Sequence, residues 1–372
     1  MRYIILITTI AVLLSLTACQ NSEFEGENRL RKMIGQMLII GFRGTEIGPS
    51  SPITHDLAGG NIGGVILFDY DVELQQYERN IESPEQVKSL INDIKNYALT
   101  PPFIAIDQEG GKISRLKERY GFPTSVSQQY LGELNNPDST RFYARRCADT
   151  LCEMGFNLNF APVVDLNVNP DSPAIGALER SFSVLPSKVI THSEIVIEEH
   201  RNKNIYNCLK HFPGHGSAQT DSHLGFTDVT DTWSEEELIP YQSLVSANKA
   251  DFIMTAHIFN SQIDSLYPAT LSQKTITGIL RDEIGFDGVI VSDDMNMSAI
   301  TEHYSLKQAI KLSLDAGVDV LVFANNLVYD EDIATKVIDI IVDLLEEDKI
   351  SYERIEKSYR RIIRKKEKVG IF

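Results

Sequence analysis

The residue types that can carry out acid/base chemistry are concentrated in one part of the sequence. Lys210 and His211 open a Lys-His-Phe-Pro-Gly-His-Gly segment, and Asp221 follows in a polar loop, two residues before His223. At that spacing the carboxylate can bend back and hold the imidazole, which fixes the ring's tautomer and raises the basicity of its other nitrogen. We therefore predict that His223 is a general acid/base oriented by Asp221. A loop in which both side chains only brace their own backbone is the alternative.

A pair of adjacent carboxylates, Asp293 and Asp294, forms the second candidate group. They follow an apolar run that begins at Val289. Neighbouring side chains on a strand point to opposite faces, so one carboxylate can enter a site while the other braces the following loop. A carboxylate in such a place can be a glycosidase nucleophile, a metal ligand or a cap for the next helix. This pair alone leaves the three roles open.

Three histidines, His211, His215 and His223, lie close enough along the chain to be considered as metal ligands. The i,i+4 spacing of the first two suits a helix, but Pro213 and Gly214 lie between them and break such a helix. We therefore predict no metal site, and nothing in the sequence requires an organic cofactor.

Alternating apolar and amphipathic segments must position these groups. Apolar, β-branched runs predict strands at Met37–Phe42, Gly64–Phe68, Phe103–Asp107, Asn157–Asp165, Ile205–Lys210, Asp251–His257, Val289–Asp293 and Asp319–Ala324. Helical periodicity predicts helices at Pro84–Leu99, Pro137–Met154, Ser187–Lys203, Ser234–Ala247, Ser272–Ile284 and Leu306–Ala316. Such strands indicate a parallel sheet covered on both faces. Eight of them favour a single-domain α/β fold of the (β/α)8 TIM-barrel type over an open sheet, because no Gly-rich dinucleotide fingerprint follows the first strand.

Charged and polar side chains recur where the predicted strands end. They are Asp107, Asp165, Lys210, His211, His257, Asp293 and Asp294. In a (β/α)8 barrel the carboxyl ends of all strands meet at one mouth, where catalytic groups are carried. The sequence therefore places the functional site at that mouth.

Composition and charge exclude several classes of protein. The 372 residues are 42% hydrophobic and 23% charged, which is typical of a globular protein rather than a disordered or disulfide-stapled one. A formal charge of −17 lacks the cationic surplus of a nucleic-acid binder, so we predict no nucleic-acid partner. The densest basic cluster predicts the polar face of a last helix; it comprises Arg360, Arg361, Arg364, Lys365 and Lys366.

The first residues indicate a secreted, lipid-anchored protein. Arg2 precedes an apolar run, Tyr3–Leu16, which is too short to span a bilayer comfortably and is typical of a signal peptide. The following Thr-Ala-Cys resembles a bacterial lipobox, in which Cys19 is lipidated and becomes the mature N-terminus. We predict a signal peptide at 1–18, a tether at 19–28 and a catalytic domain at 29–372. The alternative is an ordinary secretory signal with an accidental cysteine.

Taken together, the motifs resemble glycoside hydrolase family 3, in its single-domain bacterial β-N-acetylhexosaminidase branch. The matching segments occur in order along the chain; they are Ile106–Gly111, Phe160–Leu166, Glu179–Phe182, Lys210–Gly216, Asp221–His223, Met254–Ile258 and Gly285–Met295. The long Lys-His-Phe-Pro-Gly-His-Gly segment with its Asp-Ser-His is specific, whereas an isolated Ser-Asp-Asp is not. The resemblance runs from about Arg29 to the C-terminus.

The resemblance implies roles for individual residues. Asp293 is expected to be the nucleophile, His223 the acid/base and Asp221 its orienting partner. Lys210 and His211 correspond to the pair that grips the sugar in the first subsite. Further residues correspond to positions that contact or flank the same sugar; they are Asp107, Arg115 and Arg180.

Two positions depart from the family pattern. Lys112 stands where many relatives carry Arg, which gives a point charge in place of a planar fork. The segment Asp69–Glu78 is longer and more acidic than the usual turn after the second strand, which affects the expected aglycone.

The expected activity is exo-acting hydrolysis of terminal β-linked N-acetylglucosamine, from glycans or peptidoglycan fragments, with retention of configuration. A phosphorylase of the same fold is the alternative within enzymes, because a neutral imidazole repels an incoming phosphate less than a carboxylate does. A β-glucosidase is disfavoured, since no second domain that would supply a Glu acid/base is expected. A non-catalytic sugar-binding lipoprotein is the alternative from another class. The expected location is the cell envelope, at the membrane through Cys19, and the oligomeric state stays open.

Overall fold

The computed structural model describes residues 26–222 and 224–368 of the chain. Several predicted features lie outside the described residues. They are the predicted signal peptide, the predicted lipidation site Cys19, most of the predicted tether and the acid/base candidate His223. Residues 26–35 are helical, so helical structure begins three residues before the predicted domain boundary at Arg29.

Eight parallel strands close into a barrel, which confirms the predicted (β/α)8 fold. Around the barrel the order is β1-β12-β11-β9-β7-β6-β5-β2. The strands are β1 (Leu38–Gly41), β2 (Gly64–Leu67), β5 (Phe103–Ile106), β6 (Leu158–Asn159), β7 (Tyr206–Phe212), β9 (Phe252–Thr255), β11 (Val289–Asp294) and β12 (Val320–Phe323). Each predicted strand overlaps one of them. β6 is much shorter than predicted, and Pro162, which has no N–H to donate to a ladder, lies in the part that leaves the sheet.

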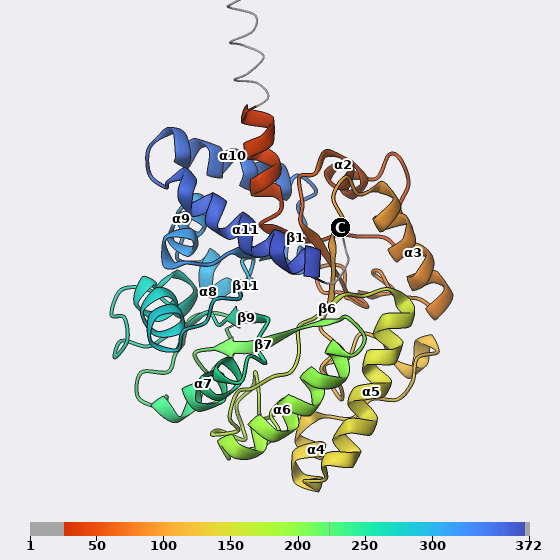
Figure 1. The fold of residues 1–372 in the computed structure, drawn as a ribbon, viewed down its shortest axis with the longest axis vertical. Helices are drawn as coiled ribbons and strands as arrows, with labels where there is room; N and C mark the ends of the chain where they lie inside the picture. Colours follow the sequence, from red (N-terminus) through yellow and green to blue (C-terminus); the bar gives the residue numbers. More distant parts are fainter. Residues whose placement is uncertain (1–25, 223, 369–372) are drawn as a thin grey trace, which may run out of the picture.

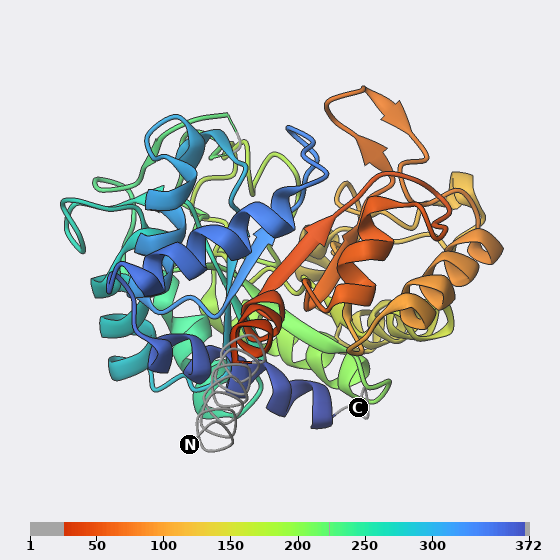
Figure 2. The same cartoon turned by 90° about the horizontal axis from the view of Figure 1, so that it is seen from above.

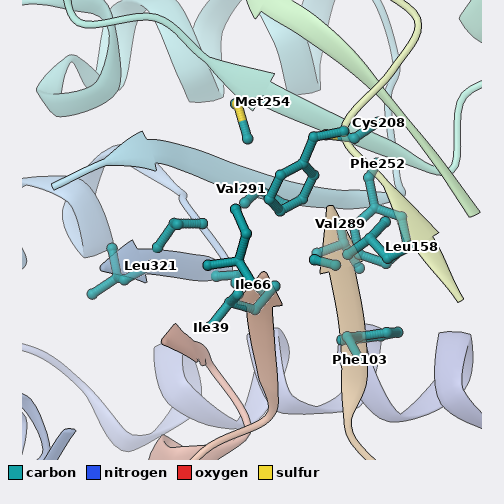
Figure 3. Close-up of a cluster of buried hydrophobic side chains, with 14 of the residues drawn as sticks. Ile39, Ile66, Phe103, Leu158, Cys208, Phe252, Met254, Val289, Val291 and Leu321 are labelled. Carbon is teal, nitrogen blue, oxygen red and sulfur yellow. The ribbon is translucent and has the colours of Figure 1, made fainter. Parts of the chain in front are cut away.

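The barrel interior is filled by apolar side chains from every strand (Figure 3). The labelled residues include Ile39 from β1, Ile66 from β2 and Leu321 from β12. The Phe103 and Phe252 rings meet edge to face with centroids 5.4 Å apart. Because these side chains are buried against one another, the interior is a packed core rather than a channel, and any ligand must bind at an end of the barrel.

Helices surround the barrel (Figure 1). They are α2 (Pro52–Gly59), α3 (Pro84–Tyr97), α4 (Gln128–Leu134), α5 (Pro137–Met154), α6 (Pro186–Arg201), α7 (Ile239–Ser246), the π-helical segment η4 (Lys274–Glu283), α8 (Ser298–Thr301), α9 (Leu306–Ala316), α10 (Ile333–Glu346) and α11 (Tyr352–Lys368). All six predicted helices are present, and α11 carries the basic cluster. No helix within residues 26–222 and 224–368 is both long and apolar enough to cross a membrane.

Local signals explain where several helices begin. Ser83 caps α3 by accepting a hydrogen bond from the N–H of Gln86, and Pro84 occupies the first helical position, where no N–H is needed. At α9, Ser305 and Gln308 form a reciprocal capping box. These caps fix the helices in register with the strands that they connect.

The loops at the carboxyl ends of the strands form the functional end of the barrel. Figure 2 shows this end at the top, where the orange β-hairpin of β3 (Tyr70–Asp71) and β4 (Gln76–Tyr77) projects beyond the strands. The dark blue α11 and the red helical residues 26–35 lie at the opposite end. The described chain therefore begins on the side of the barrel away from the mouth.

The prediction that the basic cluster forms the polar face of the last helix is wrong for Lys366, because its side chain is fully buried. Its Nζ donates hydrogen bonds to Gln36 Oε1 (2.7 Å) and to the Gly63 carbonyl (2.8 Å), and it lies 5.0 Å from the centroid of the Phe103 ring. The amine therefore sits against the closed end of the barrel rather than in solvent.

Lys366→Met is expected to flatten the pH dependence of stability. Burial lowers the pKa of Lys366 from 10.5 to about 7, so between these values the unfolded chain binds the proton more strongly than the folded chain does. The parent protein should therefore lose free energy of unfolding as the pH falls from 10.5 toward 7, and the variant should lose less. Urea unfolding across this pH range measures the difference. Equal slopes in the two proteins would contradict a buried, neutral amine.

Candidate active site

A cavity of about 330 Å³ opens at the carboxyl end of the barrel strands. Ile66 and Met254, which belong to the packed interior in Figure 3, form part of its lining. Every predicted catalytic or sugar-binding residue that the structure describes also lines it: Asp107, Arg115, Arg180, Lys210, His211, Asp221 and Asp293. The structure therefore brings these residues together at one end of the barrel, and their roles stay predictions.

Lys210 lies between two carboxylates in the wall of the cavity. Its buried Nζ is 2.7 Å from Asp107 Oδ1 and 2.6 Å from Glu109 Oε1. Burial lowers the pKa of Lys210, but the two carboxylates outweigh that effect and raise it. Burial alone would raise the pKa of Asp107, but the positive charges of Lys210 and Arg115 outweigh burial and hold this pKa well below its usual range. Lys210 and Asp107 are therefore both charged at neutral pH, and their ion pair holds them in place.

Glu109 is a site residue that the sequence prediction missed. Its two carboxylate oxygens each accept a 2.8 Å hydrogen bond from the Arg180 guanidinium, which makes a bidentate pair. Burial raises the pKa of Glu109, but the charges of Arg180 and Lys210 lower it to about 2. The only sequence signal was a second carboxylate two residues after Asp107. Glu109 thus holds two of the cations that line the cavity, Arg180 and Lys210.

His211 is held in one tautomer by its two partners. Its Nδ1 lies 2.7 Å from Asp165 Oδ2, and its Nε2 lies 3.0 Å from an Arg180 guanidinium nitrogen. Because arginine can only donate, Nε2 accepts, and the proton therefore resides on Nδ1 and is donated to Asp165. Burial lowers the pKa of His211, and the neighbouring Arg180 and Lys210 charges lower it further. The ring is accordingly neutral.

His215 contacts the loop that carries Asp221 and helps to hold it in place. The His215 N–H donates to Asp165 Oδ1 at 2.8 Å, and its Nε2 lies at hydrogen-bond distance, 3.0 Å, from the hydroxyl of Ser222. Both side chains are buried. Ser222 stands between Asp221, which lines the cavity, and His223, so Asp165 connects His211, a predicted sugar-binding residue, to the loop of the acid/base candidate.

The two adjacent carboxylates differ in their contacts. Asp294 Oδ1 accepts hydrogen bonds from the N–H groups of Asn296 and Ala324, at 3.1 and 2.9 Å, and so braces the turn after β11. Asp293 Oδ1 accepts the N–H of Asp294 at 2.8 Å. His257, predicted at the rim, is a support beneath this turn: its Nε2 lies 3.0 Å from the Asp294 carbonyl oxygen. Both carboxylates line the cavity, so only the bracing contacts of Asp294 distinguish the two as the sequence analysis expected.

Arg115 and Lys112, the two cations not yet described, differ in their position relative to the cavity. Arg115 lines the cavity, where its guanidinium lies 3.5 Å from Asp107 and 5.3 Å from the centroid of the Phe68 ring. Lys112, the departure from the family pattern, does not line it. Its half-exposed ammonium pairs with Glu179 at 2.9 Å on the surface.

The contacts of His211 argue against the metal alternative. Both ring nitrogens of His211 are engaged, and a guanidinium occupies the place that a metal ion would need at Nε2. Within the part of the chain that the structure describes, no three His, Cys, Asp or Glu side chains are grouped as metal ligands would be. The described groups are instead held by hydrogen bonds and ion pairs in a cavity that Asp293 also lines.

Comparisons with known proteins agree with this arrangement. A β-hexosaminidase A from Pseudoalteromonas piscicida is 31% identical over 377 residues, which cover 91% of this chain and 61% of that protein. A β-hexosaminidase from Idiomarina loihiensis is 34% identical over 296 residues, which cover 78% of this chain and 84% of that protein. Similarity therefore extends over most of the chain.

Solved structures give the same result. A glycoside hydrolase family 3 β-N-acetylglucosaminidase from Paenibacillus sp. str. FPU-7 aligns with a TM-score of 0.83 and 29% identity, over 92% of this chain and 62% of that one. The chain thus spans about three fifths of the Paenibacillus and Pseudoalteromonas proteins. The sequence profile of the glycosyl hydrolase family 3 N-terminal domain matches residues 29–365. The chain belongs to glycosyl hydrolase family 3.

Proposed function

We propose that this protein is a retaining, exo-acting β-N-acetylhexosaminidase that removes terminal β-linked N-acetylglucosamine. The observation that carries the proposal is the cavity in which Asp293 lies with a fixed set of charged and polar groups suited to sugar hydroxyls. The relatives described above, named as β-hexosaminidases and β-N-acetylglucosaminidases, support the same substrate.

In the proposed reaction, an Asp293 carboxylate oxygen attacks the anomeric carbon as the bond to the leaving oxygen breaks. His223 donates its proton to that oxygen, which leaves as an alcohol. A water molecule, deprotonated by His223, then displaces Asp293 and restores both groups. Two inversions give net retention. A histidine in place of the usual second carboxylate removes like-charge repulsion near Asp293.

The charged wall would bind the sugar before any bond changes. Lys210, Arg180 and Asp107 are already paired in the structure, so they need little reorganisation when hydroxyl groups replace water around them. The neutral His211 is held between Asp165 and Arg180, which keeps its ring at a fixed angle to the cavity. Binding energy at these groups positions the anomeric carbon near Asp293.

An assay of the purified barrel on an aryl β-N-acetylglucosaminide, with and without inorganic phosphate, tests the proposal. We expect free N-acetylglucosamine, released first as the β-anomer by proton NMR, at a rate that phosphate does not change. Formation of the sugar 1-phosphate would assign a phosphorylase instead. Binding of the sugar without turnover would assign a sugar-binding protein.

We also propose that Cys19 is lipidated and anchors the enzyme to the membrane of the cell envelope. The apolar run that ends at Leu16 and the Thr-Ala-Cys that follows support this. The described chain begins at the end of the barrel opposite the mouth, so a tether there would leave the cavity open to substrate.

Cys19→Ala should release the protein from bacterial membranes while the barrel stays active. Stable anchoring needs two lipid signals, such as an acylated and diacylglyceryl-modified N-terminus, because one chain alone binds weakly. Cys152→Ala, which changes an exposed cysteine of the barrel, is the matched control and should stay in the membrane fraction. Fractionation followed by activity measurement provides the comparison. A parent protein found in the soluble fraction would rule the anchor out.

A further inference from the structure

The hairpin of β3 and β4 contributes to the wall of the catalytic cavity. Tyr70 and Val72 line the same cavity as Asp293, and Val72 is 43% exposed at its rim. Lys210, by contrast, is buried deep in the wall. The hairpin therefore contributes a more exposed part of the cavity wall than Lys210 does.

Ion pairs and hydrogen bonds hold the hairpin in a single position. Asp71 Oδ2 lies 2.7 Å from Arg43 and 2.9 Å from Arg79. The Val72 N–H donates to Asn326 Oδ1 at 3.0 Å, and the same oxygen accepts a hydrogen bond from Arg79 at 2.9 Å. Asn326 follows β12 and itself lines the cavity. The hairpin, which follows β2, is thus fastened to the loop after β12, with only β1 between these two strands, and forms a preformed wall.

Three of the four acidic residues of the segment Asp69–Glu78 are used in that scaffold. Asp69 pairs with Lys117 at 2.5 Å, and Glu73 pairs with Arg43 at 2.8 Å. Asp71 is paired as described above, and none of the three lines the cavity. The segment is acidic in sequence, yet what it presents to the cavity is an aromatic and an aliphatic residue. The Tyr70 ring is further backed by Tyr77, with centroids 4.8 Å apart.

The charge of the cavity disfavours an anionic group at this wall. Among the residues that the structure describes, five carboxylates and three cations line the cavity; the carboxylates are Asp107, Glu109, Asp221, Asp293 and Asp294. Each cation has a carboxylate partner, since Lys210 and Arg115 pair with Asp107 and Arg180 pairs with Glu109. An additional carboxylate on the substrate would meet a net negative site.

From this wall we infer that the hairpin forms an aglycone subsite for a neutral pyranose ring, the second sugar of an uncharged β-linked oligosaccharide. Tyrosine combines a large apolar surface with a polar hydroxyl, which suits the C–H face and the hydroxyls of a sugar. The inference rests on the proposed function. It adds the class of aglycone, and it assigns Tyr70 as a residue that determines specificity.

Three substrates test the inference on the intact protein. They are the β-azide of N-acetylglucosamine, which has no sugar aglycone, the neutral β-1,4 disaccharide of N-acetylglucosamine, and the disaccharide whose second sugar is N-acetylmuramic acid. We expect the parent enzyme to favour the neutral disaccharide over the anionic one by about 10-fold or more in kcat/KM. Tyr70→Ala should lower kcat/KM for the neutral disaccharide by about 10-fold and change that for the azide by less than about twofold.

Two matched variants separate this role from general damage. Tyr70→Phe keeps the ring and should retain most of the activity on the disaccharide, while Leu74→Ala, which changes an exposed residue of the hairpin outside the cavity lining, should behave like the parent. An equal loss on azide and disaccharide in Tyr70→Ala, or a preference for the anionic disaccharide, would overturn the inference. Failure to cleave even the azide would instead overturn the proposed function.

Discussion

Asp293→Asn should lower kcat by about 10³-fold or more on an aryl β-N-acetylglucosaminide, because nucleophilic attack and stabilisation of the developing positive charge are lost together. The fold should persist. Asparagine has nearly the same shape as aspartate, and its Oδ1 can still accept the N–H of Asp294 that Asp293 accepts in the structure. Steady-state kinetics and thermal unfolding, measured on the same preparation, give the two results.

Asp294→Asn is the matched control for this loss. The side-chain oxygen of asparagine can replace Asp294 Oδ1 in accepting the N–H groups of Asn296 and Ala324, so the turn after β11 should stay in place. We expect a loss of less than about tenfold. If Asp294→Asn were the more damaging of the two substitutions, the roles of the adjacent carboxylates would have to be exchanged.

His223→Ala should damage substrates with poor leaving groups far more than activated aryl glycosides. An alcohol leaving group needs a proton in the transition state, whereas an acidic phenol hardly does, and general acid catalysis contributes about 10²- to 10⁴-fold. An unperturbed imidazole has a pKa of about 6.5, so His223 must gain proton affinity from Asp221 to donate near neutral pH. The measurement is kcat/KM across leaving groups of graded acidity.

Asp221→Ala should copy the His223→Ala pattern more weakly, since the imidazole is then present but misoriented. A metal site would give a different result, namely sensitivity to chelators and equal loss on every leaving group. If the His223 variant responded to leaving-group pKa no more steeply than the parent does, His223 would be removed from the acid/base role.

The barrel could be predicted from the sequence because its signals are local. Strands buried on both faces require uninterrupted apolar residues, and the runs at Gly64–Phe68 and Phe103–Asp107 end within one residue of the observed strands. The predicted strand at Asn157–Asp165 was longer than β6 because apolar residues continue past Asn159. Hydrophobicity alone does not show where the hydrogen-bond ladder between two strands ends. α10 was not predicted, although its buried face carries Ile338 and Ile341.

The site was predictable in part for the same reason. Residues at strand ends, such as Asp107 and Lys210, face the mouth because of the fold alone. Glu109 was missed because its role depends on Arg180 and Lys210, which lie 71 and 101 residues away and meet it only in the closed barrel. The burial of Lys366 could not be predicted either, because its hydrogen-bond acceptors, Gln36 and Gly63, lie 330 and 303 residues earlier in the chain.

The acidity of Asp69–Glu78 shows how charge in a sequence can mislead about a site. Three of its four carboxylates are paired with Arg43, Arg79 and Lys117, all of which lie outside the segment. A count of charges along the chain cannot show that these carboxylates are paired in the fold. The folded hairpin instead contributes Tyr70 and Val72 to the cavity lining.

Covalent trapping tests the central claim most directly. A slow, fluorinated N-acetylglucosaminide with a good leaving group should form a glycosyl-enzyme that accumulates, because fluorine slows its hydrolysis more than its formation. Proteolysis and mass spectrometry should then find one added sugar, carried by Asp293, and the Asp293→Asn variant should stay unlabelled. A label on Asp294, Asp107 or Glu109 would contradict the mechanism.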